Sequence, residues 1–510
     1  MNRQPIPTTT ARTVIRLCQA QTRMEAWRMA EPVDFELCEG EHLAIVGENG
    51  SGKTMFVDML TGHHPLVGQE PYYDFSPNAH ELVSDNIAYI AFRDCYGGDN
   101  DRTYFLQQRW NQLEIDEETP LVGTLLEEAY LLSGKDCPER RMFQQHLYDL
   151  FQIHQLLDKY IILLSSGELR KFQLIKVLLR NPRILIMDNP FIGLDAQTRS
   201  QLNELLSTLA EKQQLQIILV LSKHTDIPPI VTHIVEVRDM KVMSKIPVHD
   251  FLMRKEKKSD LKTIQAKPAD ETTLDNRIAT LEKPENDYQV SKVVNMNKVN
   301  IRYGTRTILK DFTWQVANEE HWALSGENGS GKSTLLSLIC ADNPQSYACD
   351  ITLFDKKRGS GESIWDIKRH IGYVSPEMHR AYQRDISCVK IVASGLKETV
   401  GLYSHPTAEE YTRCKHWMEI FGIEQLADKS FMKISSGEQR MVLLVRAFVK
   451  SPQLLILDEP LHGLDDDRCR LVKSIINAYC RQKNKTLIMV SHYEEEFPKC
   501  ITHRLNLVKN

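Results

Sequence analysis

The chain has 510 residues, a formal net charge of −5 and a hydrophobic fraction of 42%. This length allows two large domains with substantial cores, and the nearly balanced charge provides no overall basic field for binding nucleic acid. The 11 cysteines are scattered without a CxxC pair, which argues against a disulfide framework or a zinc site and fits free thiols in a reducing compartment. Met1–Arg16 is polar and Thr-rich, and no apolar run reaches the roughly 18 residues of a membrane-spanning helix. We therefore expect a cytoplasmic chain that would reach a membrane only through a partner.

Short apolar runs alternate with helical stretches along the chain, the pattern of a parallel sheet covered by helices. We therefore predict the α/β fold class. The clearest predicted strands are His42–Val46, Ile87–Phe92, Ile184–Met187, Ile217–Leu221, Trp322–Ser325, Ile371–Val374, Leu454–Leu457 and Leu487–Val490, and the clearest helices are Lys53–Leu60 and Lys332–Cys340.

Three sequence blocks occur twice in the same order, the second time about 270 to 280 residues later. LAIVGENGSGKTM returns as ALSGENGSGKSTL, LSSGELRKFQL as ISSGEQRMV, and ILIMDNPFIGLD as LLILDEPLHGLD. Such a repeat indicates two copies of one domain. We predict a first domain at residues 1–254, a second at 287–510, and between them a charged stretch, 255–286, that reads as a linker or a solvated surface helix.

Each copy carries G-x-x-x-x-G-K-[ST] between a predicted strand and a predicted helix. The glycines let backbone N–H groups surround phosphate oxygens, and the helix N-terminus adds a partial positive charge. We predict that Lys53 and Lys332 reach the β- and γ-phosphates of ATP, and that Thr54 and Ser333 bind Mg²⁺. The predicted ATP-binding residues of these phosphate loops are Gly47, Glu48, Asn49, Gly50, Ser51, Gly52, Lys53 and Thr54, and then Gly326, Glu327, Asn328, Gly329, Ser330, Gly331, Lys332, Ser333 and Thr334.

An aspartate ends an apolar strand in each copy, Asp188 after ILIM and Asp458 after LLIL. A carboxylate in this position beside a phosphate loop can orient Mg²⁺ through the water shell of the ion. We predict both aspartates as Mg²⁺ sites, and we place Asp458 and Lys332 in the catalytic set.

The block between loop and strand identifies a family. Leu164–Glu168 reads LSSGE and Ile434–Glu438 reads ISSGE, each about 20 residues before its strand-ending Asp. This resembles the signature loop of the ATP-binding cassette (ABC) superfamily, and Gly193–Asp195 and Gly463–Asp465 resemble its D-loop. The signature residues implied by this resemblance are Ser165, Ser166, Gly167, Glu168, Ser435, Ser436, Gly437 and Glu438.

The resemblance implies two tandem ABC-type nucleotide-binding domains, each with a helical subdomain that carries the signature loop. It also implies a Mg²⁺-dependent ATPase in which each ATP lies between one domain's phosphate loop and the other domain's signature loop. Gly326–Ser333 would pair with Leu164–Glu168, and Gly47–Thr54 with Ile434–Glu438. Because both domains share one chain, we expect an intramolecular sandwich in a monomer.

The two copies differ where the family places its catalytic groups. The residue after the strand-ending Asp is Glu459 in the second copy, a carboxylate that can polarise water, and Asn189 in the first, an amide that is a poor base. At the family's switch histidine the second copy has His492. The first has Lys223 in register and His224 one residue later, so either a loop shift rescues the histidine or its role is lost, and we favour loss.

The aromatic residue that stacks on adenine in the family corresponds to Tyr303, whereas the first copy has Met24 in register and Trp27 nearby. Together these differences predict hydrolysis mainly at the second phosphate loop and a holding role for the first. Neither copy offers the family's Q-loop glutamine in register. The polar stretch Gly97–Asn111 is either an adapted contact loop or an ordinary solvated loop.

Within the superfamily the chain resembles the ModF-type group, whose name links it to molybdate transport, on Asp101–Asn111, Ile371–Glu377 and Ser394–Tyr403. This resemblance implies an energy-coupling ATPase that acts with a membrane permease. Tandem sugar importers usually carry their weakened site in the second half, whereas here the first half is weakened. ABC-F translation factors have a long basic arm between domains and Glu after both strand-ending aspartates, whereas this chain has a short stretch of mixed charge and one Asn. DNA-associated ATPases need a coiled-coil insertion, for which the spacing between phosphate loop and signature leaves no room. We keep an ABC-F-like ATPase acting on the ribosome or another cytoplasmic partner as the alternative.

Overall fold

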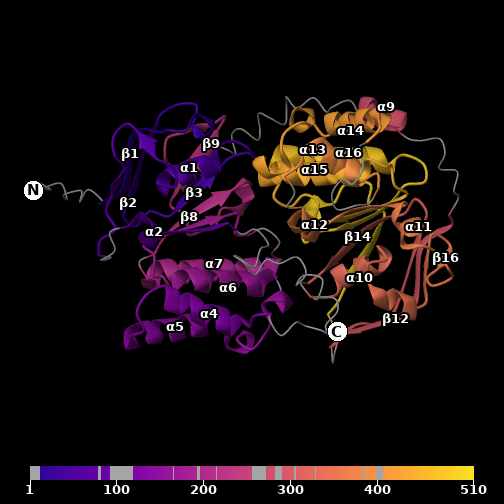
Figure 1. Ribbon diagram of the computed structural model, residues 1–510, viewed down its shortest axis with the longest axis horizontal. Coiled ribbons are helices and arrows are strands. Elements are labelled where there is room, and N and C mark those ends of the chain that lie inside the picture. Colours follow the sequence, from indigo (N-terminus) through magenta and orange to yellow (C-terminus); the bar gives the residue numbers. More distant parts are fainter. Residues whose placement is uncertain are drawn as a thin grey trace, which may run out of the picture.

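Two halves of similar construction lie side by side in the computed structural model (Figure 1). The structure describes residues 12–509 except 78–81, 92–118, 165, 192–193, 195, 214, 255–270, 282–289, 304–305, 328, 383–384 and 398–405. The predicted Gly97–Asn111 loop lies outside the described residues. So do Ser165, Gly193, Asp195 and Asn328 of the predicted site.

The core of each half is a parallel sheet with one strand order. In the first half the order is β9-β3-β8-β7-β6, with the short antiparallel strands β10 and β11 on β9, and in the second it is β20-β14-β19-β18-β17. Each strand has its counterpart in the same place, which confirms the predicted α/β class and the repeat. The strands are β3 (Leu43–Val46), β6 (Ile87–Ala91), β7 (Ile184–Asp188), β8 (Gln216–Leu221), β9 (His233–Arg238), β10 (Lys241–Val242), β11 (Ile246–Pro247), β14 (His321–Gly326), β17 (Ile371–Val374), β18 (Leu454–Asp458), β19 (Thr486–Val490) and β20 (His503–Leu507).

The central strands are continuous apolar runs because both of their faces are covered. Every residue of β8 and β19 is buried, and β7 and β18 are buried up to the aspartate that ends each of them. This places the two strand-ending carboxylates at the carboxyl edge of each sheet, beside the loop that follows β3 or β14. A smaller antiparallel sheet adjoins each core and comprises β1 (Thr13–Thr22), β2 (Val33–Cys38), β4 (Leu66–Val67) and β5 (Tyr72–Tyr73), or β12 (Lys292–Tyr303), β13 (Arg306–Ala317), β15 (Ile351–Leu353) and β16 (Lys356–Lys357).

Helices cover the sheets and form a helical subdomain in each half (Figure 1). None of the described helices is long and apolar enough to cross a membrane. In the first half they are α1 (Lys53–Leu60), α2 (Val83–Asn86), α4 (Val122–Leu132), α5 (Pro138–Phe151), α6 (Ser166–Leu178) and α7 (Ala196–Gln213). In the second half they are α10 (Lys332–Ile339), α11 (Ile364–Lys368), α12 (Pro376–Ala381), α13 (Cys388–Ser394), α14 (Ala408–Ile420), α15 (Ser436–Phe448) and α16 (Asp466–Cys480), and α9 (Glu271–Leu281) precedes them.

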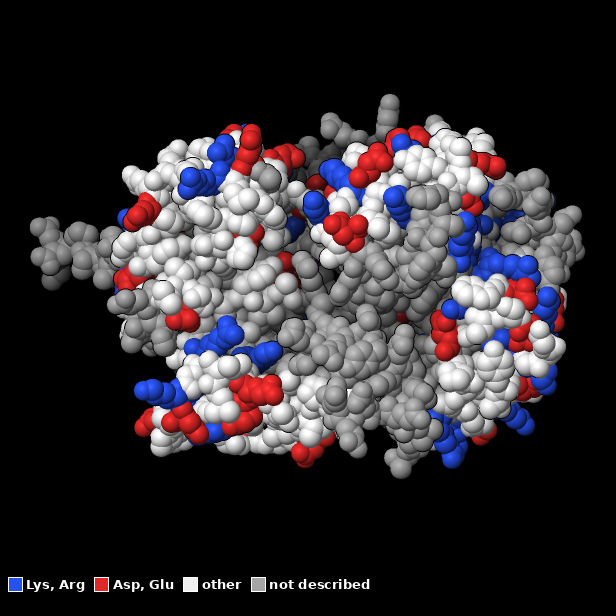
Figure 2. Space-filling view, viewed as in Figure 1, with Lys and Arg blue, Asp and Glu red and all other residues white. Residues whose placement is uncertain are grey.

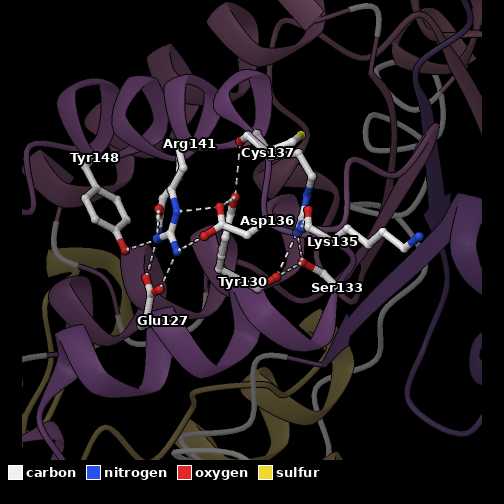
Figure 3. A network of polar contacts seen from close by, with 10 residues as sticks. Glu127, Tyr130, Ser133, Lys135, Asp136, Cys137, Arg141 and Tyr148 are labelled. Atoms are coloured by element: carbon white, nitrogen blue, oxygen red, sulfur yellow. Dashed lines mark hydrogen bonds and ion pairs between the residues drawn. The ribbon is translucent and has the colours of Figure 1, made fainter.

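A polar network fixes the turn between α4 and α5, the two helices against which α6 packs (Figure 3). The Arg141 guanidinium lies 4.0 Å from the centroid of the Tyr130 ring and pairs with Asp136 at 2.9 Å and Glu127 at 2.8 Å. Tyr130 Oη donates to Asp136 at 2.7 Å. Since α6 begins at the first predicted signature loop, this network helps to hold the helix that presents that loop.

Helix α9 is docked on the second half, although its stretch of sequence was predicted to be a linker or a solvated helix. Ile278 is fully buried in the core that includes α14 and α16. Arg277 pairs with Glu419 at 2.9 Å, and Asp275 pairs with Arg481 at 2.7 Å. Leu274, Ile278 and Leu281 share one face of the helix and pack on this core, so the sequence held a short periodic signal. The burial depends on a face supplied by α14 and α16. The predicted domain limits stay predictions.

If α9 is held chiefly by this burial, Ile278→Ala should lower the free energy of unfolding by about 2–5 kcal/mol, the usual cost of truncating a buried Ile. The measurement is urea unfolding followed by circular dichroism. Asn276→Ala, on the exposed side of the same helix, is the matched control and should have little effect. Equal stability of the two variants would show that α9 is not packed as described.

Candidate functional site

The two predicted phosphate loops have the same internal geometry. Lys53 Nζ donates to the carbonyl oxygens of Gly47 at 2.7 Å and Glu48 at 2.8 Å, and Lys332 Nζ does the same with Gly326 at 2.6 Å and Glu327 at 2.9 Å. Each lysine amine therefore lies inside the curl of its own loop, at the start of its helix. The structure brings the described residues of each predicted loop together around that amine.

Glycine is required where these loops turn. Gly52 has φ of 104° and Gly331 of 101°, both in the left-handed region that favours glycine. A Cβ on Gly47 would lie 2.2 Å from the Val237 carbonyl oxygen, and one on Gly326 would lie 2.4 Å from that of Leu507. The loops can therefore pass close to β9 and β20 only because these positions carry no side chain.

Burial lowers the pKa of the Lys53 amine to about 8, although the carboxylates of Asp188 and Asp465 oppose this shift. The charge of Arg468 on the second half lowers the pKa further. Arg468 itself pairs with Asp465 at 3.7 Å. A bound anion would favour the charged form of the buried Lys53 amine. This electrostatic arrangement suits a polyphosphate at the first loop.

Hard oxygen donors converge beside each loop. The helix N-termini supply the hydroxyls of Thr54 and Ser333. Strands β7 and β18, each separated by one strand from the strand that leads into the loop, end at Asp188 and Asp458. Hydroxyl and carboxylate oxygens are the ligands that Mg²⁺ prefers, so the donor set fits this ion. Asp188 is positioned by Tyr89 Oη, which donates to its carboxylate at 3.0 Å.

The second half holds a carboxylate between two imidazoles. Glu459 Oε1 lies 3.1 Å from His492 Nε2, and Glu459 Oε2 lies 3.3 Å from His462 Nδ1. Burial would raise the pKa of the Glu459 carboxyl, but the hydrogen bond from His492 and the charges of His462, His492 and Arg440 outweigh it and lower the pKa. Glu459 is thus held as an anion at the carboxyl edge of the sheet, next to Asp458.

The first half has the same backbone but different chemistry. Asn189 has φ of 50°, as does Glu459, so both side chains leave the main chain at the same left-handed residue. The Asn189 amide donates to Asp188 at 2.8 Å, and the Ser222 hydroxyl lies 3.2 Å from Asn189 Oδ1. An amide that donates to the neighbouring carboxylate cannot serve as a base there.

Neither candidate for the first-half switch residue takes the place of His492. Lys223 Nζ donates to Glu496 of the second half at 3.0 Å. The ring of His224 packs edge-on against Phe251, with centroids 5.4 Å apart. These placements favour loss of the usual role over a rescue by loop shift.

Asn49 of the first phosphate loop contacts the second half directly. Its side-chain amide donates to the Gly463 carbonyl at 2.8 Å, and its backbone N–H donates to Asp465 at 3.2 Å. A Cβ on Gly437, in the second predicted signature loop, would lie 2.0 Å from Asn49 Nδ2. The structure therefore brings the first phosphate loop together with the second signature block and the second D-loop block.

The second signature loop is capped from within. Ser435 Oγ and N contact the Glu438 carboxylate at 2.7 Å and 2.9 Å, so these two residues close a capping box at the start of α15. In the first loop Glu168 pairs with Lys159 at 2.9 Å. The expected pairing of Leu164–Glu168 with the second phosphate loop involves Ser165, outside the described residues, and stays a prediction.

The residues considered for stacking on adenine lie at the end of a strand in the second half and in a turn in the first half. Tyr303, at the end of β12, accepts from the Asn343 amide at 2.8 Å. Met24 is exposed, and Trp27 packs on His64 with ring centroids 5.0 Å apart. The proposed stacking of Tyr303 on adenine stays a prediction.

Where the family has its Q-loop, the second half has a short helix. Ser375 caps α12 by accepting from the backbone N–H of Met378 at 3.1 Å. His379 Nε2 then lies 2.8 Å from the Gln439 side-chain oxygen, next to the signature loop. A contact between these two segments is thus present without a glutamine in the usual register.

Several residues at the site were missed in the sequence. His462 stands in PLHGLD where the first copy has PFIGLD, so comparing the copies more closely would have singled it out. Arg199, Tyr493 and Glu496 belong to no sequence motif. Their contacts join the two halves, so no single sequence block could reveal them.

The contact between Asn49 and Gly437 is testable. Gly437→Ala would push the halves apart and break the Asn49–Gly463 hydrogen bond, so amide hydrogen exchange in the 461–468 segment should speed up by about tenfold. Ser436→Ala, at the exposed neighbouring position, is the control and should leave exchange unchanged. Unchanged exchange in Gly437→Ala would contradict the close packing of the two loops.

Comparison with known proteins agrees with this geometry. The ABC transporter family model matches residues 30–192 and 309–462, once in each half. The ABC transporter ATP-binding protein ModF of Escherichia coli is 34% identical over 503 residues, which cover 97% of this chain and 96% of ModF. Uncharacterized ABC transporter ATP-binding proteins of Schizosaccharomyces pombe and Saccharomyces cerevisiae are 28% and 25% identical, each over 93% of this chain and over 94% and 92% of their own lengths. The chain therefore belongs to the ABC transporter family, as a tandem ATPase similar to ModF with two ATP-binding domains.

Proposed function

We propose that the chain binds two ATP molecules between its halves and hydrolyses ATP mainly at the second phosphate loop. The observation that carries this proposal is the carboxylate of Glu459, held as an anion between His492 and His462, where the first half has Asn189. Glu459 would accept a hydrogen bond from the attacking water and so polarise it. His492 would contact the γ-phosphate after turning from Glu459.

The other predicted residues would position the nucleotide. Lys332 and the backbone N–H groups of its loop would bind the β- and γ-phosphates, and Tyr303 would stack on adenine. When bound, Mg²⁺ neutralises charge on the phosphates; Ser333 and Asp458 would hold it at the second site, and Thr54 and Asp188 at the first. The signature residues that begin α6 and α15 would donate to the phosphates from the opposite half.

The first site would hold ATP rather than turn it over. Its phosphate loop leads into the N-terminus of α1 and has a buried lysine. Its amide at Asn189 is bound to Asp188, and its switch position is occupied by Lys223, which faces Glu496. Binding without efficient chemistry is the expected outcome of this combination.

This division of labour predicts unequal effects of matched substitutions. Glu459→Gln should lower kcat for ATP hydrolysis by about 10²–10⁴, the usual contribution of a general base. Asn189→Gln, the equivalent amide change in the first half, should leave kcat within about twofold, since no base is lost there. Steady-state phosphate release measures both.

A Glu459→Gln variant with the wild-type rate would contradict hydrolysis at the second site. Asn189→Glu tests the same model from the other side. Because the main chain at residue 189 already has the φ of Glu459, the grafted carboxylate should be accommodated without new backbone strain.

The output of ATP turnover is the second part of the proposal. We infer that the chain couples ATP hydrolysis to transport, of the molybdate type, by acting in the cytoplasm with a membrane permease. Similarity to the ABC transporter ATP-binding protein ModF over nearly the whole chain supports this. An ABC-F-like ATPase that acts on the ribosome or another cytoplasmic partner is the alternative.

The charge distribution favours the first of these outputs. Over the face seen in Figure 2, basic and acidic side chains are interspersed on both halves rather than gathered into one basic field. In sequence the stretch between the halves is of mixed charge, and its described part is the docked helix α9. Binding to ribosomal RNA would draw on a concentration of positive charge.

Co-purification separates these outputs. With Glu459→Gln used to prolong the ATP-bound state, we expect affinity-purified chain from gently solubilised cells to retain a membrane permease and no ribosomal proteins. Recovery of ribosomal subunits would favour the alternative. The Lys53→Ala, Lys332→Ala double variant, which removes the lysine of both phosphate loops, is the control for capture that does not depend on ATP.

A further inference from the structure

Hydrogen bonds within the loop that carries His492 join the residues before and after it. It follows β19 and leads into the 3-10 helix Glu494–Glu496. The Ser491 hydroxyl donates to Glu496 Oε2 at 2.6 Å and accepts from the Tyr493 backbone N–H at 3.1 Å. Glu496 and Tyr493 are thus linked through Ser491, and His492 lies within this small ring of contacts.

One bond from the first half reaches this loop through Lys223. Lys223 Nζ donates to Glu496 Oε1 at 3.0 Å, and the two side chains are only 21% and 15% exposed. Burial acts to lower the pKa of the Lys223 amine, but the charge of Glu496, its hydrogen bond and the charges of Cys469 and Asp226 together raise the pKa, so the pair is ionic. In the repeat Lys223 occupies the position of His492, so the residue that replaces the first switch group binds the loop of the second.

A second set of bonds reaches the same loop through Arg199, on α7 of the first half. Arg199 Nη1 donates to Tyr493 Oη at 3.3 Å, and Arg199 Nη2 donates to Asp226 at 2.8 Å. Tyr493 Oη in turn donates to the Leu194 carbonyl at 3.3 Å. Leu194 stands inside the first GLD block, so the residue after His492 contacts the first D-loop segment directly.

We propose that Lys223–Glu496 and Arg199–Tyr493 form a cross-half clamp that positions His492 at the second site, an inference that rests on the proposed function of that site. The two anchors on the second half, Tyr493 and Glu496, follow His492 by one and four residues. The anchors on the first half are Lys223, which follows β8, and Arg199 in α7. The first half has no histidine at its own switch position. Lys223 at that position instead binds the loop that carries His492 in the other half.

The clamp assigns Lys223, Arg199, Tyr493 and Glu496 as positioning residues. They act on the reaction through the orientation of His492. Misplacing a reacting group by about an ångström costs on the order of 10–100-fold in rate. Loss of one clamp contact should therefore lower kcat while ATP binding at the phosphate loops is kept.

The test measures kcat and KM for MgATP in the full chain. Lys223→Met and Tyr493→Phe should each lower kcat by about tenfold and change KM by less than about twofold, the pattern of an interaction needed after substrate has bound. Lys223→Arg keeps the charge and should restore most of the rate. Glu494→Gln is the matched control, since Glu494 lies in the same 3-10 helix but pairs with Arg504 of its own half.

His492→Ala separates failure of this inference from failure of the proposed function. A wild-type rate in His492→Ala would remove the basis of both. If His492→Ala is inactive while Lys223→Met and Tyr493→Phe keep wild-type kcat, the clamp is overturned and the proposed function stands.

Two further results would also overturn the clamp. One is an equal loss of kcat in Glu494→Gln, which would reflect a general effect of charge in this helix. The other is a lower thermal unfolding midpoint in the clamp variants with no change in kcat, which would show that the contacts only join the halves.

Discussion

The contact of Asn49 with the second half fixes how the two copies face each other. Asn49 is bonded to Gly463 and Asp465 and leaves no room for a side chain on Gly437. A phosphate loop by itself supplies donors on one side of a polyphosphate only. By bringing the first loop against the start of α15, this contact places the second signature block opposite that loop.

Given that arrangement, the two sites differ by a few side chains on equivalent backbone. The residue after the strand-ending aspartate has the same φ in both halves, and only its side chain decides whether a base is present. The freed switch position in the first half then forms an ionic contact with the second. Loss of chemistry at one site and support of chemistry at the other are in this view two consequences of the same substitutions.

Much of the fold could be predicted from the sequence because its signals are local. The strands that precede the phosphate loops are short apolar runs, and so are the segments that end at the aspartates of β7 and β18. Such runs are typical of buried parallel strands. The family and the ATPase activity were likewise predicted, and the match of the ABC transporter family model in both halves confirms them. The position of α9 could not be predicted, since it depends on a hydrophobic surface formed by helices that lie more than a hundred residues later.

The site was only partly predictable for the same reason. Motif residues such as Lys332, Glu459 and His492 were visible because each stands at a fixed place in its block. Their partners across the halves were not, because Lys223–Glu496 and Arg199–Tyr493 are set by the approach of two surfaces. His462 could have been found from the sequence, because it is a difference between the copies in an otherwise repeated block.

The central claim is that one site holds ATP while the other hydrolyses it. It is tested most directly by the composition of nucleotide bound to the wild-type chain during steady-state turnover, after rapid removal of free nucleotide and acid quenching. The account predicts one unhydrolysed ATP retained per chain in addition to any ADP. Recovery of bound nucleotide as ADP alone, at two per chain, would contradict it.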